Sequence, residues 1–140
     1  MAAGLAALGL LAGCAKPADE AALRAALAEG QQAIEARDAD RLMDLVGDEF
    51  GGPDGMDRAG LRRYAALMLL GQQRVGLTLG PVTVELHGDR AVARFDALVT
   101  GGGRFVPEGA EARRVETVWR LEGGEWKLAS ADWSQPALGR

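Results

Sequence analysis

Side chains able to do nucleophilic or metal chemistry are few in this sequence. It holds one cysteine, Cys14, and one histidine, His87. One thiol cannot form an internal disulfide, and one thiol with one imidazole is too few for a structural zinc site. His87 would have to be the base of any nucleophilic triad, and its setting in His87-Gly88-Asp89 is typical of an exposed turn. We therefore expect neither a bound metal nor a histidine-based hydrolase, and nothing in the sequence calls for a cofactor.

The best candidate for acid–base chemistry is Asp132. The segment Glu122-Gly123-Gly124-Glu125 predicts a two-residue turn between two antiparallel strands. Counting outward from that turn places Val115 opposite Asp132, with Arg113 diagonal to the carboxyl group. The pocket predicted on this face, with its tyrosine contributed by a helix, comprises Arg113, Val115, Thr117, Ser130, Asp132, Ser134 and Tyr64.

Other interpretations of these residues stay open at this point. Burial would raise the pKa of Asp132, whereas a close arginine would lower it. Asp132 and Arg113 could form only a salt bridge at the rim, or a register shift of one residue could put both on the outer face. Tyr64 could instead be an ordinary core residue.

The elements that must position these side chains follow from the spacing of apolar residues. Helical periodicity predicts helices over residues 18–37, 39–46 and 57–71, with Asp38 and Asp57 placed to cap the second and third. Alternation of apolar and polar residues then predicts hairpins over 82–99 and 115–133. Helices first and strands second predict one α+β domain.

Three helices precede long strands that close on Val115-Glu116-Thr117-Val118-Trp119-Arg120-Leu121-Glu122-Gly123-Gly124-Glu125-Trp126-Lys127-Leu128. Over residues 22–135 this pattern resembles the nuclear transport factor 2-like (SnoaL-like) superfamily. The resemblance implies a cone, in which three N-terminal helices pack on a curved antiparallel sheet. It also implies an apolar interior that holds a small ligand or a catalytic site, and dimerisation through the outer face of the sheet.

No catalytic residue set of that superfamily carries over to this chain. Members similar to scytalone dehydratase use more than one histidine, and the polyketide cyclases pair an aspartate with a histidine. Members similar to ketosteroid isomerase use a tyrosine with two acids, and Tyr64 lies on a different helix from theirs. We therefore expect a non-catalytic ligand-binding or assembly domain. The alternative is a small isomerase, dehydratase or cyclase that transfers protons with Asp132 as general base.

The first residues of the chain predict where the protein is located in the cell. Residues 1–13 carry no charged or polar side chain and end in Leu11-Ala12-Gly13-Cys14, which resembles the lipobox of bacterial lipoproteins. The resemblance implies that residues 1–13 are a signal peptide, that Cys14 is lipidated, and that residues 14–21 form a tether. Ala15 after the cysteine favours the periplasmic face of the outer membrane. The alternative is an apolar N-terminal helix with a buried cysteine.

The charge balance restricts the partners. Sixteen Lys and Arg residues stand against twenty Asp and Glu residues, which gives a formal charge of −4. The basic residues are scattered rather than gathered in a stripe, so a nucleic acid partner is not expected. The expected partners are a membrane through Cys14, a small apolar ligand, and a second copy of the chain.

Overall fold

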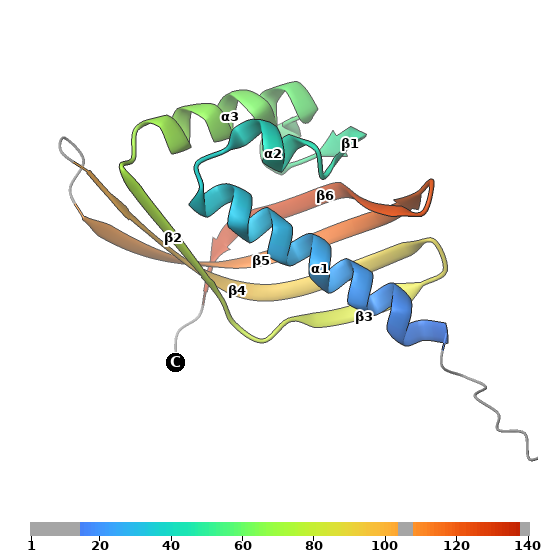
Figure 1. The fold of residues 1–140 in the computed structure, drawn as a ribbon. Helices are drawn as coiled ribbons and strands as arrows, with labels where there is room; N and C mark the ends of the chain where they lie inside the picture. The colour runs from blue at the N-terminus through green and yellow to red at the C-terminus, as the bar shows by residue number, and fades with distance from the viewer. Residues whose placement is uncertain (1–14, 104–107, 138–140) are drawn as a thin grey trace, which may run out of the picture.

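A computed structural model describes residues 15–103 and 108–137 (Figure 1). The helices are α1 (Ala15–Glu35), α2 (Ala39–Met43), the short 3-10 helix η1 (Pro53–Gly55) and α3 (Arg58–Leu70). The strands are β1 (Val46–Gly51), β2 (Arg74–Leu79), β3 (Thr83–His87), β4 (Arg90–Gly102), β5 (Gly109–Glu122) and β6 (Glu125–Pro136). Within the described residues, no helix is both long and apolar enough to cross a membrane.

The helix caps lie where the sequence predicts them. The carboxylate of Asp38 accepts a hydrogen bond from the backbone N–H of Arg41 at 3.0 Å, and that of Asp57 accepts one from Gly60 at 2.8 Å. These contacts satisfy N–H groups that have no partner within the first helical turn. The second helix ends at Met43, earlier than predicted, because the chain enters β1 at Val46.

The strands form one six-stranded sheet in the order β1-β6-β5-β4-β2, with β3 also pairing with β4. The two predicted hairpins are confirmed as β3–β4 and β5–β6, while β1 and β2 were not predicted. Gly123 and Gly124 both have positive φ, as a tight hairpin turn of this kind requires. The β1–β6 pairing is parallel, so the sheet is antiparallel except at this edge.

Helix α1 lies across the concave face of the sheet, and α2 and α3 cover the β1–β6 side (Figure 1). One core cluster joins Leu23 of α1 to Ala91, Ala93, Trp119 and Trp126 of the sheet. The other contains Met43, Val46, Phe50, Leu61 and Ala131. Every buried residue of both clusters lies between 23 and 131, so residues 15–140 include both clusters as far as the structure describes them. This arrangement confirms the predicted α+β architecture of three helices packed on a curved sheet.

The register of β5 against β6 differs from the prediction beyond the first few pairs. Near the turn, Trp119 pairs with Leu128 as expected, but Glu116 then pairs with Asp132 and Arg114 with Gln135. Two irregularities, one between Val118 and Trp119 and one between Arg114 and Glu116, cause the shift. Each leaves an extra residue in β6, and a shift of one residue moves a side chain to the other face.

Candidate functional site

A cavity of about 330 Å³ lies inside the cone, between the three helices and the concave face of the sheet. Its size is at the lower end of the range for small-molecule sites. The walls are mostly aliphatic and aromatic, and the larger side chains include Leu27 and Ile34 of α1, Leu61 and Met68 of α3, Leu77 and Leu79 of β2, Phe95 of β4, Trp119 of β5 and Leu128 of β6. The cavity is therefore suited to an apolar molecule.

In the part of the chain that the structure describes, four side chains of the wall are polar, namely Gln31, Tyr64, Arg113 and Thr117. Two of them, Gln31 and Thr117, form hydrogen bonds within the domain. Gln31 donates its side-chain N–H to the carbonyl of Leu77 at 2.6 Å. Thr117 donates its hydroxyl to the carbonyl of Ala93 at 2.9 Å and accepts the indole N–H of Trp119 at 2.8 Å. These bonds satisfy groups that would otherwise be costly to bury.

The remaining two polar residues lie where the cavity meets solvent. Tyr64 and Met68 of α3 and Val99 of β4 line the cavity and are 40%, 51% and 38% exposed, which marks the mouth between these elements. The ring of Tyr64 packs against that of Trp133, with centroids 5.7 Å apart. Arg113 of β5 is paired in register with Ala97, two residues before Val99, and therefore lies on the same side of the cavity.

Among the described residues that line the cavity, Arg113 is the only charged one. It forms an ion pair with Glu111, two residues away on β5, and donates one guanidinium N–H to the carbonyl of Ser134 at 3.4 Å. Its side chain is 36% exposed and that of Glu111 is 57% exposed. The predicted partnership of Arg113 with Asp132 is not present.

The structure brings four of the predicted pocket residues together and separates the other three. Arg113, Val115, Thr117 and Tyr64 line the cavity. Ser130, Asp132 and Ser134 do not, since the irregularities in β6 give Val118 and Glu116 of the outer face as the partners of Ser130 and Asp132. The predicted placement of these three residues in the pocket is wrong, for the reason that the prediction itself named as an alternative.

Asp132 is exposed and engaged with its own strand. Its carboxylate accepts hydrogen bonds from the backbone N–H of Ser134 at 2.8 Å and from the Ser134 hydroxyl at 2.6 Å. The hydroxyl and then the backbone N–H stabilise the charged form and hold the pKa of Asp132 below its ordinary value. A carboxylate of lowered pKa is a weak base near neutral pH, and this one lies outside the cavity.

Trp133 lines the cavity, although it was not among the pocket residues predicted from the sequence. Its position could have been inferred from which apolar residues of β6 have even numbers and which have odd ones. Trp126 and Leu128 occupy even positions, whereas Ala131 and Trp133 occupy odd ones, and all four are directed to the inside of the cone. Such a change of parity within one strand is what a bulge produces.

His87 and the outer face of the sheet lie away from the cavity. His87 ends β3 as an exposed turn residue, with Nε2 3.5 Å from Glu85. On the outer face Arg94 forms ion pairs with Glu85 and Glu116, so the surface expected to support a dimer is largely charged. Within residues 15–103 and 108–137, no three His, Cys, Asp or Glu side chains are grouped as a metal site would need.

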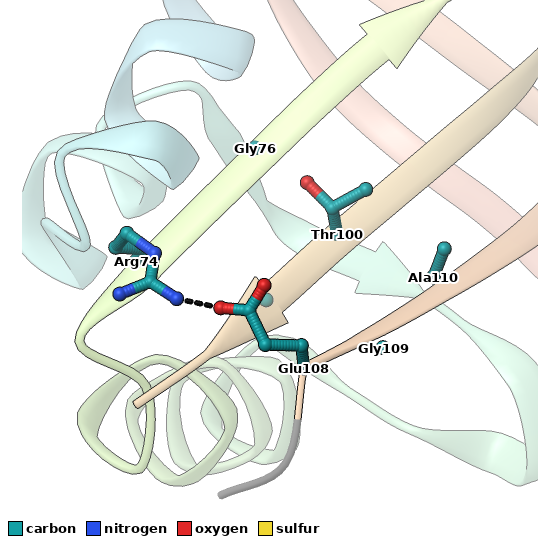
Figure 2. A pocket seen from close by; sticks show the side chains of 7 residues that line it. Arg74, Gly76, Thr100, Glu108, Gly109 and Ala110 are labelled. Carbon is teal, nitrogen blue, oxygen red and sulfur yellow. Dashed lines mark ion pairs between the residues drawn. The ribbon is translucent and has the colours of Figure 1, made fainter. Parts of the chain in front are cut away.

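A second hollow, of about 400 Å³, lies on the outer face where β2 and β5 begin and β4 ends. Figure 2 shows Arg74 and Glu108 directed toward each other across it, with Thr100 and Ala110 beside them. These are the two charged residues among the described ones that line the hollow, and they form an ion pair. The hollow is open to solvent and its two charges are paired with each other, so it is a weaker candidate for a ligand site than the interior cavity.

Comparison with known proteins places this geometry in a known fold. A protein of the nuclear transport factor 2-like superfamily from Salmonella enterica superposes with a TM-score of 0.78 at 18% identity, covering 90% of this chain and 96% of its own. The chain has the nuclear transport factor 2-like fold. No protein-family model matches the sequence, and no curated protein does.

Two further structures with the nuclear transport factor 2-like fold come from proteins for which dehydratase activity has been suggested. The one from Streptomyces avermitilis has a TM-score of 0.73 at 21% identity, covering 88% of this chain and 99% of its own. The other, from Novosphingobium aromaticivorans, is described as of scytalone dehydratase type and has a TM-score of 0.78 at 10% identity, covering 89% and 91%. At these identities the likeness is one of fold alone.

Proposed function

We propose that this nuclear transport factor 2-like domain binds a small, mostly apolar molecule in its cavity and does not transform it. The observation that carries the proposal is the composition of the wall. No Asp, Glu, His, Cys or Lys is among the described residues that line the cavity. Burying apolar ligand surface there contributes about 25 cal/mol per Å², which is enough for binding without a strong polar anchor.

The enzyme alternative is less well supported. Proton transfer needs an acid or base within hydrogen-bond reach of the substrate and with a pKa near the working pH. Asp132 is outside the cavity, and its hydrogen bonds from Ser134 lower its pKa. The hydroxyl of Thr117 is already bonded on both sides. A dehydratase activity like that suggested for the two structural neighbours would lack a base here.

The experiment that tests binding is a calorimetric titration of residues 15–140 with octanamide, a neutral amphiphile of about ten non-hydrogen atoms. Bonded non-hydrogen atoms occupy less than the roughly 30 Å³ of a molecule in liquid water, so ten of them fit within the cavity of about 330 Å³. We expect saturable binding of one molecule per chain. Absence of saturable heat at any soluble concentration, with the protein shown to be folded by circular dichroism, would rule the proposal out.

We also propose that the domain is attached to the bacterial cell envelope by a lipid on Cys14, on the periplasmic face of the outer membrane. The lipobox-like segment supports the attachment, and the fold is compatible with it. Helix α1 begins at Ala15, and the carbonyl of Asp19 near this end accepts the indole N–H of Trp126, close to the β5–β6 turn. The mouth residues Val99 and Arg113 lie toward the other end of the sheet. A lipid at Cys14 would thus leave the mouth free.

Substituting Cys14 with serine is expected to abolish the anchoring. The full chain expressed in a bacterial host should gain the mass of a diacylglyceryl group and of further acyl chains, and should partition into detergent. The Cys14→Ser chain should gain no lipid and stay in the aqueous phase, because oxygen does not replace the acceptor sulfur. Intact mass spectrometry after membrane fractionation checks both points. A wild-type chain with an unmodified thiol would contradict the anchoring.

A further inference from the structure

The charged residue at the mouth of the cavity narrows the chemistry of the ligand. This inference rests on the proposed binding function and adds to it. We propose that the ligand is a small amphipathic monocarboxylate, whose apolar chain occupies the cavity and whose carboxylate pairs with the guanidinium of Arg113. The apolar wall of the cavity is suited to the chain of such a ligand. Arg113, the charged residue among the described residues of the wall, is suited to its carboxylate.

The position of Arg113 fits a head-group contact. Its neighbours on the same face of β5, Val115 and Thr117, line the deeper wall, so a chain lying along β5 would end at the guanidinium. Arg113 is only half-buried, and the carbonyl that it contacts belongs to Ser134, next to Trp133 at the mouth. A carboxylate at this point would keep part of its hydration while its chain is buried.

The guanidinium has donors to spare for such a ligand. An arginine side chain carries five N–H donors in a planar fork that matches a carboxylate. Among the described residues, the acceptors of Arg113 are one oxygen of Glu111 and, at 3.4 Å, the carbonyl of Ser134. The second contact is longer than a strong hydrogen bond. Glu111 is mostly exposed, so it can turn into solvent when a ligand carboxylate takes its place.

Glu111 also restricts the charge of the head group. A single positive charge beside a carboxylate favours a monoanion over a phosphate monoester, which would bring close to two negative charges to the same place. Glu111 would compete with the ligand for the guanidinium in either case. Its removal is therefore expected to tighten the binding of a monocarboxylate.

Calorimetric titration with octanoate and with octanamide tests the assignment, because the two molecules have the same shape and differ in charge. The proteins are residues 15–140 as wild type, Arg113→Met, Glu111→Gln and Arg114→Met. Arg114 is the matched control, since it is the next residue on β5 and its side chain contacts Asp96 on the outer face. Near neutral pH we expect the wild type to bind octanoate about tenfold more tightly than octanamide, as one charge-assisted bond allows.

In Arg113→Met this preference should disappear, through weaker octanoate binding and unchanged octanamide binding. Glu111→Gln should bind octanoate several-fold more tightly, and Arg114→Met should behave like the wild type. Equal affinities of the wild type for the two molecules, or a preference that survives in Arg113→Met, would overturn the carboxylate assignment while leaving the cavity as an apolar site. Failure of the wild type to bind either molecule would overturn the binding function, and the assignment with it.

Discussion

Replacing Val115 with tryptophan is expected to abolish the binding of octanamide while the domain stays folded. Val115 lies on the inner face of β5, opposite Phe95 of β4, and lines the cavity. An indole at this position would occupy much of the space of about 330 Å³ that the ligand needs. We expect the affinity to fall by more than about tenfold, which corresponds to about 1.4 kcal/mol, and to pass below detection in calorimetry.

The stability of Val115→Trp should change little, or increase. Overpacking a filled core costs about 1–3 kcal/mol, but here the new ring enters empty space and gains dispersion contacts with the wall. Thermal unfolding followed by circular dichroism measures this effect beside the titration. Full binding by a folded Val115→Trp protein would mean that the ligand site is elsewhere.

Val118→Trp is the matched control for this substitution. Val118 lies on the same strand, three residues away, and its register partners are Val92 and Ser130 of the outer face. The same residue is therefore exchanged on the same strand, but outside the cone. Binding of octanamide by this variant should equal that of the wild type. A loss of binding in both variants would indicate a general effect on the sheet rather than obstruction of the cavity.

Features fixed by neighbouring residues could be predicted from the sequence. Asp38 and Asp57 cap helices through N–H groups three residues away, and Gly123 and Gly124 allow the tight turn by themselves. These contacts depend on local backbone chemistry, which the residue types determine. Apolar alternation was sufficient to predict the hairpin that contains the buried residues Trp119 and Trp126.

Strands that depend on distant partners could not be predicted in the same way. In β1 the order Val46-Gly47-Asp48-Glu49-Phe50-Gly51 does not alternate, and the strand exists through its parallel pairing with β6, far along the chain. In β2 apolar residues do alternate with an arginine, a glycine and a threonine, but the strand has only six residues and its apolar side chains are only half-buried. Sheet edges of this kind follow from tertiary context more than from intrinsic preference.

Only part of the candidate site was predicted, because the assumption of a regular pairing between β5 and β6 is wrong. Arg113, Val115 and Thr117 belong to β5 and keep their faces, whereas Asp132 belongs to β6 beyond an irregularity. An extra residue in an antiparallel strand bends the strand and increases its twist, which a sheet wrapped round α1 requires. The curvature that creates the cavity therefore also turns Asp132 away from it.

Replacing Trp119 with alanine is expected to be the most destabilising change in the sheet. Trp119 is 3% exposed and packs with Leu23, Ala91 and Ala93 in the core between α1 and the sheet. Truncating a buried tryptophan costs about 3–5 kcal/mol, a large part of the roughly 5–15 kcal/mol that stabilise a domain. Urea unfolding followed by far-ultraviolet circular dichroism measures the loss.

Two further variants separate the contributions to this loss. In Thr117→Val the indole N–H of Trp119 loses its acceptor while the packing is retained, and we expect about 1–3 kcal/mol for the unpaired buried donor. In Trp133→Ala the lost ring bordered the mouth, so the loss should be smaller than for Trp119→Ala, at about 1–2 kcal/mol. Equal losses from the two tryptophans would contradict a division of the cone into a packed end around Trp119 and an open end around Trp133. A smaller loss of stability for Trp133→Ala than for Trp119→Ala would mean that residues at the open end can be changed to alter binding with little loss of stability.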